Sequence, residues 1–218
     1  MSTRQTAPPL PAGACSAGPG RRSINRSQVV DAAARLVDDE GIDALNLTRV
    51  AEALGVSQPA LYNHVGGVGD LLRHLALLAR QRLVDCLRDA AVGRVEAQAV
   101  AAVADAWRRF AREHPGLYAA TDRHPLAGYD DLEAAVADIV SVLQRVVSSF
   151  GIEGAHAEHG AWSVRSAIHG FVVLELEEGH PSHLDLDESF VLLVHLLCSG
   201  LRGLAASAGG EAETEVMT

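Results

Sequence analysis

Residues 47–65 read LTRVAEALGVSQPALYNHV and describe two short helices joined by a turn. Gly55 permits a tight turn, and Ser57 followed by Pro59 is typical of the start of a helix. Apolar side chains at i, i+3, i+4 and i+7 define one face of the helix before the turn: Leu47, Val50, Ala51 and Leu54. The sequence therefore predicts a helix-turn-helix over about residues 46–65.

The second helix of this pair carries a polar face that is too hydrophilic to bury. Gln58 stands at its N-terminal end, where an amide can pair with adenine, and Pro59 and Ala60 permit close approach to a base. Tyr62 and His64 are placed to donate hydrogen bonds to phosphates. The alternative is an ordinary surface turn. The DNA-binding interpretation assigns to the interface Arg26, Thr48, Arg49, Ser57, Gln58, Pro59, Ala60, Tyr62, Asn63 and His64.

The rest of the chain predicts an all-α protein. Hydrophobic residues make up 48% of the 218 residues and aromatic residues only 4%, so a core would consist mainly of Ala, Leu and Val. Helical periodicity recurs about nine times, and we find no long β-branched alternation. We expect a disordered arm (1–22), a DNA-binding unit (23–83), a ligand-binding and dimerisation bundle (84–206) and a disordered tail (207–218).

Charge is distributed unequally along the chain. The formal net charge is −10, and every basic residue is arginine. Residues 1–73 hold seven arginines and seven acidic residues, whereas residues 74–218 carry the whole net charge. Arg21, Arg22 and Arg26 lead into the first helix as a basic arm. A neutral N-terminal unit joined to an acidic body is compatible with a nucleic-acid partner for the N-terminal unit alone.

The cysteines and the apolar runs indicate a cytoplasmic protein. Cys15, Cys86 and Cys198 are odd in number and widely spaced, which argues against a disulfide framework or a zinc finger. The N-terminus has no apolar segment typical of a signal peptide. The longest uncharged apolar run, 190–201, is too short to cross a bilayer, so we expect no membrane partner.

The run LTRVAEALGVSQPALYNHVGGVGDLLRHLA (47–76) closely resembles the N-terminal domain of TetR-family transcriptional regulators. The resemblance covers about residues 23–83. It implies a three-helix DNA-binding domain whose fourth helix leads to a ligand-sensing bundle. Many members carry a lysine after the Tyr-x-His run, where it reaches a phosphate. This chain has Gly66-Gly67-Val68-Gly69 there, so backbone N–H groups would have to replace that contact.

The second half shows a further resemblance. The stretches AWRRFAREHPGLYAAT (106–121) and AWSVRSAIHGFVVLELEEGH (161–180) are similar to the WHG-type C-terminal domain of some TetR-like regulators. One hypothesis is that aromatic and polar side chains from neighbouring helices line a ligand pocket. The competing interpretation is that these side chains simply fill a core. The candidate ligand-binding residues are Trp107, Phe110, His114, Tyr118, Trp162, Arg165 and His169.

The final predicted helix, about 187–206, is apolar on two faces, so it either lies central in a core or covers a core and a partner. The resemblance implies a four-helix dimer interface, to which we assign Phe190, Leu193, Val194, Leu197 and Leu201. Val191, Leu192, Leu196 and Cys198 form the second face.

Together with the family resemblance, these patterns lead us to expect a homodimeric repressor that binds a palindromic operator in double-stranded DNA and is released by a small-molecule effector, with no cofactor. The competing class is a helical enzyme or a metal-binding protein with a His-rich site, for which His156 and His159 near Glu153 and Glu158 are the candidates. No nucleophile–base set is recognisable, so we expect no enzyme activity. A third class, an architectural DNA-binding protein, is opposed by the acidic second half.

Overall fold

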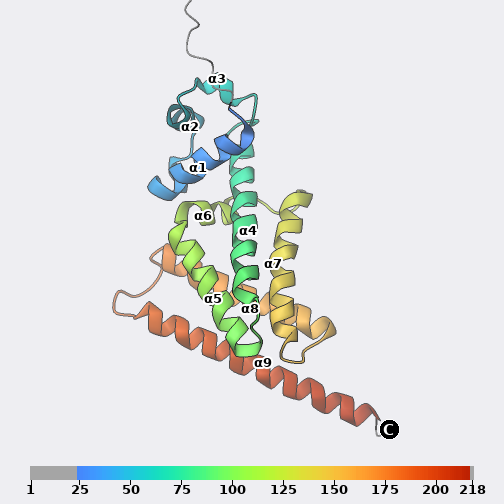
Figure 1. The fold of residues 1–218 in the computed structure, drawn as a ribbon. Helices are drawn as coiled ribbons and strands as arrows, with labels where there is room; N and C mark the ends of the chain where they lie inside the picture. The colour runs from blue at the N-terminus through green and yellow to red at the C-terminus, as the bar shows by residue number, and fades with distance from the viewer. Residues whose placement is uncertain (1–23, 217–218) are drawn as a thin grey trace, which may run out of the picture.

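The computed structural model describes residues 24–216, and within that range the chain forms nine α-helices, one short 3-10 helix and no strand (Figure 1). The predicted arm (1–22) lies outside the described residues. The elements are α1 (Arg26–Glu40), η1 (Ile42–Ala44), α2 (Leu47–Leu54), α3 (Gln58–Leu61), α4 (Val68–Ala91), α5 (Glu96–Glu113), α6 (Pro115–Arg123), α7 (Asp130–Ser148), α8 (Gly154–Leu176) and α9 (Leu186–Val216).

The first three helices form a small head at one end of the molecule (Figure 1). α1 begins with a capping box, in which Asn25 accepts the Gln28 N–H and the Gln28 side chain accepts the Asn25 N–H. Gly55 ends α2 in the left-handed conformation (φ 67°), as the turn requires. The apolar faces of the three helices meet in a core that includes Val29, Val50 and Leu61.

α4 is a single 24-residue helix that starts in the head and continues through the body (Figure 1). Leu71 and Leu75 near its start, and Leu83 and Leu87 nearer its end, are all buried in one continuous hydrophobic cluster. The boundary predicted at residue 83 therefore falls inside a helix. Head and body share a rigid element and a common core.

In the body, α5, α6 and α7 pack against α4. α8 packs against α5 and α7, and α9 lies across one end (Figure 1). Arg108 of α5 joins three helices: its Nε and Nη2 donate to Glu175 of α8 at 2.8 and 2.6 Å, and its Nη1 lies 2.8 Å from Asp187 of α9. The guanidinium also lies 4.7 Å from the Phe190 ring centroid. These contacts fix which side of α9 faces the body.

Two helix ends differ from the sequence-based expectation. α3 ends at Leu61 rather than near His64, because the chain turns so that the His64 N–H donates to the Leu61 carbonyl at 2.8 Å. α9 continues to Val216, although we predicted a disordered tail from residue 207. Ala and Glu are strong helix formers and account for much of that extension despite two glycines. Met217 and Thr218 lie outside the described residues.

The first part of α9, Leu186–Ser207, is long and apolar enough to span a membrane by length and composition alone. The sequence analysis counted only the uncharged run 190–201, whereas this longer helix stays apolar on average although it includes charged residues near its ends. Only 17% of its most apolar window is buried within the chain. α9 thus presents an apolar surface that the described chain leaves uncovered.

Candidate nucleic-acid interface and effector site

The side chains predicted to bind DNA gather at the tip of the head. Leu61 and Val65 are buried and hold α3 against the head, so the polar side of α3 faces solvent. Tyr62 is 56% exposed. The other exposed members of the predicted set are Arg26, Thr48, Ser57, Gln58, Pro59 and Asn63, and the half-buried members are Arg49, Ala60 and His64.

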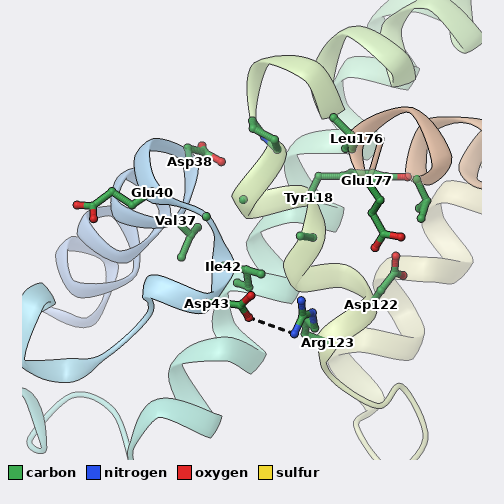
Figure 2. Close-up of a pocket in the computed structure, with 15 residues that line it drawn as sticks. Val37, Asp38, Glu40, Ile42, Asp43, Tyr118, Asp122, Arg123, Leu176 and Glu177 are labelled. Atoms are coloured by element: carbon green, nitrogen blue, oxygen red, sulfur yellow. Dashed lines mark ion pairs between the residues drawn. The ribbon is translucent and has the colours of Figure 1, made fainter. Parts of the chain in front are cut away.

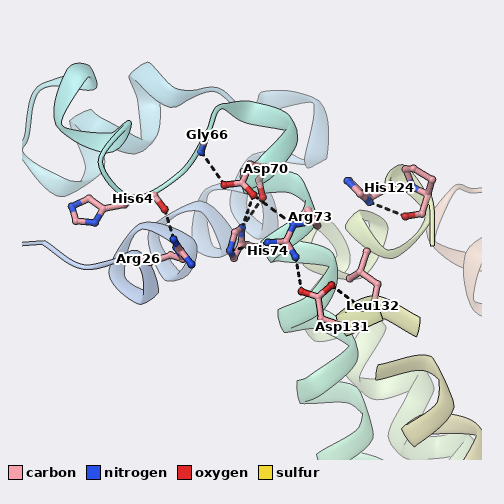
Figure 3. A network of polar contacts seen from close by, with 10 residues as sticks. Arg26, His64, Gly66, Asp70, Arg73, His74, His124, Asp131 and Leu132 are labelled. Atoms are coloured by element: carbon pink, nitrogen blue, oxygen red, sulfur yellow. Dashed lines mark hydrogen bonds and ion pairs between the residues drawn. The ribbon is translucent and has the colours of Figure 1, made fainter. Parts of the chain in front are cut away.

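Hydrogen bonds fix the tip internally. The Thr48 hydroxyl donates to Gln58 Oε1 at 3.3 Å, which aligns the N-terminal ends of α2 and α3. Arg26 Nε donates to the His64 carbonyl at 2.9 Å and ties α1 to the turn after α3 (Figure 3). Arg49 forms an ion pair with Glu40 in this structure, so a phosphate would have to compete with that carboxylate.

The glycine run after α3 forms the turn into α4. Gly67 has φ 141° and ψ −172°, a conformation that L side chains rarely adopt. The Asp70 carboxylate accepts the Gly66 N–H at 2.9 Å and also lies 3.5 Å from Arg73 Nε (Figure 3). The Gly66 and Arg73 contacts, with a charge interaction from His74, lower the pKa of Asp70 even though burial raises it. Gly67 provides no side-chain cap, so backbone N–H groups are available at the start of α4.

Three of the predicted ligand-binding residues belong to a packed core. Trp107, Phe110 and Tyr118 are each at most 4% exposed. Trp107 Nε1 donates to the Tyr118 hydroxyl oxygen at 2.8 Å, and that hydroxyl lies 2.6 Å from His169 Nδ1. An indole N–H can only donate, so the Tyr118 hydroxyl oxygen accepts from Trp107. The hydroxyl can therefore donate its own proton to His169. The other ring nitrogen of His169, Nε2, lies 3.4 Å from Asp122.

The other predicted ligand-binding residues, His114, Trp162 and Arg165, lie at the edge of this core or outside it. His114 Nδ1 lies 2.9 Å from Asp38 in the head. Trp162 is 49% exposed on α8, and the guanidinium carbon of Arg165 lies 4.8 Å from its ring centroid. The predicted set therefore contains both buried and exposed positions, because helical spacing alone does not distinguish them.

The polar core around Tyr118 also contains two arginines. Arg80 is buried, and its guanidinium donates to the Thr121 carbonyl at 2.8 Å and to the Ala76 carbonyl at 3.1 Å. Burial lowers the pKa of both Arg80 and Arg165. Burial raises the pKa of Asp122, but its contacts with His169, Thr121 and Arg80 bring it below its ordinary value. These contacts therefore favour the ionised form of Asp122.

A groove of about 360 Å³ lies between the head and the body (Figure 2). The end of α1 and η1 form one wall, and α6 with the end of α8 forms the other. Tyr118 is the member of the predicted ligand set that lines it. Its lining is Val37, Asp38, Glu40, Gly41, Ile42, Asp43, Pro115, Gly116, Tyr118, Ala119, Asp122, Arg123, Val173, Leu176 and Glu177.

The wall of this groove includes the contacts that join head and body. The sequence analysis did not predict these contacts. Asp38 of α1 accepts the Leu117 N–H of α6 at 2.8 Å through Oδ1. At Gly116 an added Cβ would lie 1.8 Å from the Val37 carbonyl oxygen, so the two backbones touch. Asp38 belongs to a run of acidic residues, and no local pattern distinguishes it from its neighbours.

The residues assigned to the dimer interface face the chain's own core. Phe190 and Leu201 are buried, and Leu193, Val194 and Leu197 are half-buried against the hydrophobic cluster. The apolar side chains of α9 that remain open to a partner lie on the second face: Val191 (69% exposed), Leu192 (56%) and Leu196 (60%).

Among the side chains described, those of residues 24–207, no group of three or more His, Cys, Asp and Glu converges in a way that could hold a metal ion. The His156 and His159 pair of the competing metal hypothesis therefore gains no converging third ligand from the described part of the chain.

A helix-turn-helix with an exposed polar second helix, mounted through a long helix on an all-α body, defines a DNA-binding transcriptional regulator. Residues 29–75 match the family described as bacterial regulatory proteins, tetR family, and residues 100–197 match the tetracyclin repressor-like C-terminal domain. The chain belongs to the TetR family of transcriptional regulators. The resemblance found in the sequence and the all-α fold class are thereby confirmed.

Individual relatives agree with this assignment. The chain is 35% identical over 192 residues to the uncharacterized HTH-type transcriptional regulator Rv0681 of Mycobacterium tuberculosis, covering 88% of this chain and 87% of the relative. It is 46% identical over 59 residues to the class D tetracycline repressor protein of Escherichia coli, covering 26% and 27%. The fold is similar to that of the transcriptional regulator SCO7222, a TetR from Streptomyces coelicolor (TM-score 0.65, 21% identity, 84% and 100% coverage).

Proposed function

We propose that this protein is a dimeric, effector-responsive repressor that binds a palindromic operator in the cytoplasm, and that it acts by binding rather than by catalysis. The observation that carries the proposal is the exposed polar face of α3, which buried Leu61 and Val65 hold outward at the tip of the head. The similarity of the head to a tetracycline repressor protein supports repression rather than activation.

Each part of the tip has a role in this proposal. Gln58, at the first position of α3, would read a base edge in the major groove. Tyr62, Thr48 and the backbone N–H groups at the start of α4 would contact phosphates and set the register. Those N–H groups take the place of the lysine that many relatives carry after the Tyr-x-His run.

Dimerisation would place two heads on one operator. The uncovered apolar face of α9 (Val191, Leu192 and Leu196) is a self-complementary surface if two copies meet about a two-fold axis. Two α3 helices on successive major grooves then lie about 34 Å apart. An effector that favours a head–body arrangement with another spacing would release the operator.

Selection of bound DNA from a random pool tests the proposal. We expect enrichment of a palindrome with half-sites about one helical turn apart. The Gln58→Ala variant should relax the preference at one position of each half-site, whereas Tyr62→Phe should weaken binding about equally for all sequences. No enrichment at low salt, or the same sequence-independent loss from both variants, would contradict the assignment.

A further inference from the structure

Long polar side chains occupy the space between α8 and the pair α4 and α6. α8 packs closely against α7, α5 and α9, whereas its backbone approaches α4 and α6 at few points. The side chains that interact across this space, called the polar layer below, are Arg80 of α4, Tyr118 of α6, and Arg165 and His169 of α8. The buried residues of the body are otherwise mostly Ala, Leu and Val, so the polar layer requires a physical explanation of its own.

Arg80 is buried without an ion pair to any carboxylate in residues 24–207. Its side chain is 6% exposed, and Nη1 and Nη2 donate to the backbone carbonyls of Ala76 and Thr121 at 3.1 and 2.8 Å. A carbonyl oxygen carries only a partial charge, so these bonds satisfy the donors without neutralising the guanidinium. Burial of a charge without a counter-ion is costly, and burial accordingly lowers the pKa of Arg80.

Arg165 has a buried donor with no acceptor. Its Nε has no hydrogen-bond partner among the described residues. The guanidinium stacks instead on an aromatic ring, with its carbon atom 4.8 Å from the ring centroid of Trp162. Trp162 is 49% exposed and Arg165 is half-buried, so this end of the polar layer can be reached from solvent. A guanidinium with an unpaired buried N–H and an accessible side is suited to bind an anion.

Positive charge exceeds negative charge in the polar layer. Arg165 lowers the pKa of Arg80, so the two guanidinium groups lie close enough to repel each other. Asp122 is the carboxylate whose charge acts on both arginines. Its side chain is 49% exposed and lies 3.4 Å from His169 Nε2, so solvent screens its charge and the imidazole shares it. Asp122 therefore balances the two arginines only in part.

We propose that the polar layer is the binding site for an effector that is an organic carboxylate, whose oxygens accept hydrogen bonds from Arg165 and whose charge is stabilised by Arg80. Such a ligand gives Arg165 Nε an acceptor and adds the negative charge that Asp122 supplies only in part. Arginine suits it because the planar donors of a guanidinium match the two oxygens of a carboxylate. The proposal rests on the effector-responsive function proposed above and names the ligand class and its site.

The polar layer is connected to the head through α6. Arg80 donates to the Thr121 carbonyl near the end of this helix. Two residues further on, Arg123 lies 3.3 Å from Asp43 of η1 in the head (Figure 2). A carboxylate that attracts the Arg80 guanidinium competes with its bond to α6. The ligand then has different affinities for different positions of α6 and the head, as coupling to DNA affinity requires.

Calorimetric titration of the full chain at constant ionic strength tests the ligand class. The probes are acetate, benzoate and phenylacetate, each compared with its neutral amide. We expect at least one carboxylate to bind about tenfold more tightly than its amide, because hydrogen bonds between charged groups add roughly that factor. No preference for the carboxylate in any of the three pairs would overturn the proposal. Inorganic phosphate that binds as tightly as the best carboxylate would overturn the assignment to carboxylates.

The Arg165→Gln variant tests the site and separates binding from packing. Because Arg165 Nε has no partner among the described residues, the variant should melt at about the wild-type temperature. It should nevertheless bind the carboxylate about tenfold more weakly. Arg165→Lys keeps the charge without the planar donors and should lose less affinity.

Arg145→Gln is the matched control, because it removes the same charge from an exposed arginine on α7, and it should leave the affinity unchanged. Equal losses of affinity from Arg165→Gln and Arg145→Gln would show that the carboxylate does not bind at the polar layer. A large drop in the melting temperature of Arg165→Gln with unchanged affinity would show that Arg165 serves packing alone.

The link to DNA is measured separately. With the operator obtained by selection, the tightest-binding of the three carboxylates should weaken the DNA affinity of the wild type. The same concentration should leave the DNA affinity of Arg165→Gln unaltered. A carboxylate that binds without changing DNA affinity would overturn its role as effector. Operator selection is done without any ligand, so failure of the effector proposal and failure of the DNA-binding proposal give different results.

Discussion

Asp38 of α1 caps the first turn of α6, because its Oδ1 accepts the Leu117 N–H at 2.8 Å across the boundary between head and body. The same carboxylate lies 2.9 Å from His114 Nδ1 through its other oxygen. A helix cap is normally a local contact, whereas this one joins residues 79 positions apart in the chain. The N-terminus of α6 is therefore a point where the body holds the head.

Removal of this cap should weaken the contact between head and body. Asp38→Ala should lower the free energy of unfolding by about 1 kcal/mol, as for other helix caps, measured by urea denaturation. Asp38→Asn keeps an acceptor oxygen and should lose less. Asp39→Ala is the matched control because Asp39 is the exposed neighbour in the same acidic run. Equal losses from Asp38→Ala and Asp39→Ala would contradict the role assigned to the cap.

Gly116 should tolerate no side chain. Its added Cβ would lie 1.8 Å from the Val37 carbonyl oxygen, which is backbone and has little room to move. We expect Gly116→Ala to lower the free energy of unfolding by more than about 2 kcal/mol, the range for overpacking. Gly69→Ala, at a helical glycine with no atom within 4 Å of the added Cβ, should be neutral or stabilising. A melting temperature unchanged by Gly116→Ala would contradict the close contact.

The uncovered face of α9 should govern assembly. Val191→Glu would place a charge in the proposed dimer interface, and light scattering should then report monomers at concentrations where the wild type is dimeric. Val92→Glu is the control, since Val92 is similarly exposed (72%) but lies after α4 rather than on α9. A wild type that is monomeric, or a Val191→Glu variant that stays dimeric, would refute this interface.

Ionisation of Tyr118 should make folding sensitive to alkaline pH. Burial raises the pKa of Tyr118 well above its ordinary value, against the opposing hydrogen bond from Trp107. The unfolded chain releases this proton near pH 10 and the folded chain only at higher pH, so stability is complete below about pH 10 and falls above it. Urea denaturation at several pH values should show a smaller alkaline loss for Tyr118→Phe. An identical loss in both proteins would contradict the assignment.

The local features of the head could be predicted from the sequence because they depend on residues close together in the chain. The spacing of Leu47, Val50 and Leu54 is the face that packs, and Gly55 adopts the left-handed conformation that ends α2. The exposed face of α3 follows from the burial of Leu61 and Val65. The capping box of Asn25 and Gln28 is also a local sequence pattern, and it marks the start of α1 at Arg26.

The groove between head and body could not be predicted in the same way. Aromatic residues at helical spacing fit a packed core and a pocket equally well, and the structure places Trp107 and Phe110 in the core. The groove instead lies where α1 and η1 meet α6 and the end of α8. Its residues come from segments with no shared sequence pattern, so only their meeting in space defines it.

The sequence by itself determined the helices, the helix-turn-helix and the family, because helical periodicity, turn residues and caps are local. The tertiary structure decided which of the two apolar faces of α9 is covered and where head and body join. Periodicity shows which side chains share a face, but the partner of that face depends on contacts such as those of Arg108 with Glu175 and Asp187. Those contacts bring distant segments together, and their geometry exists only in the folded chain.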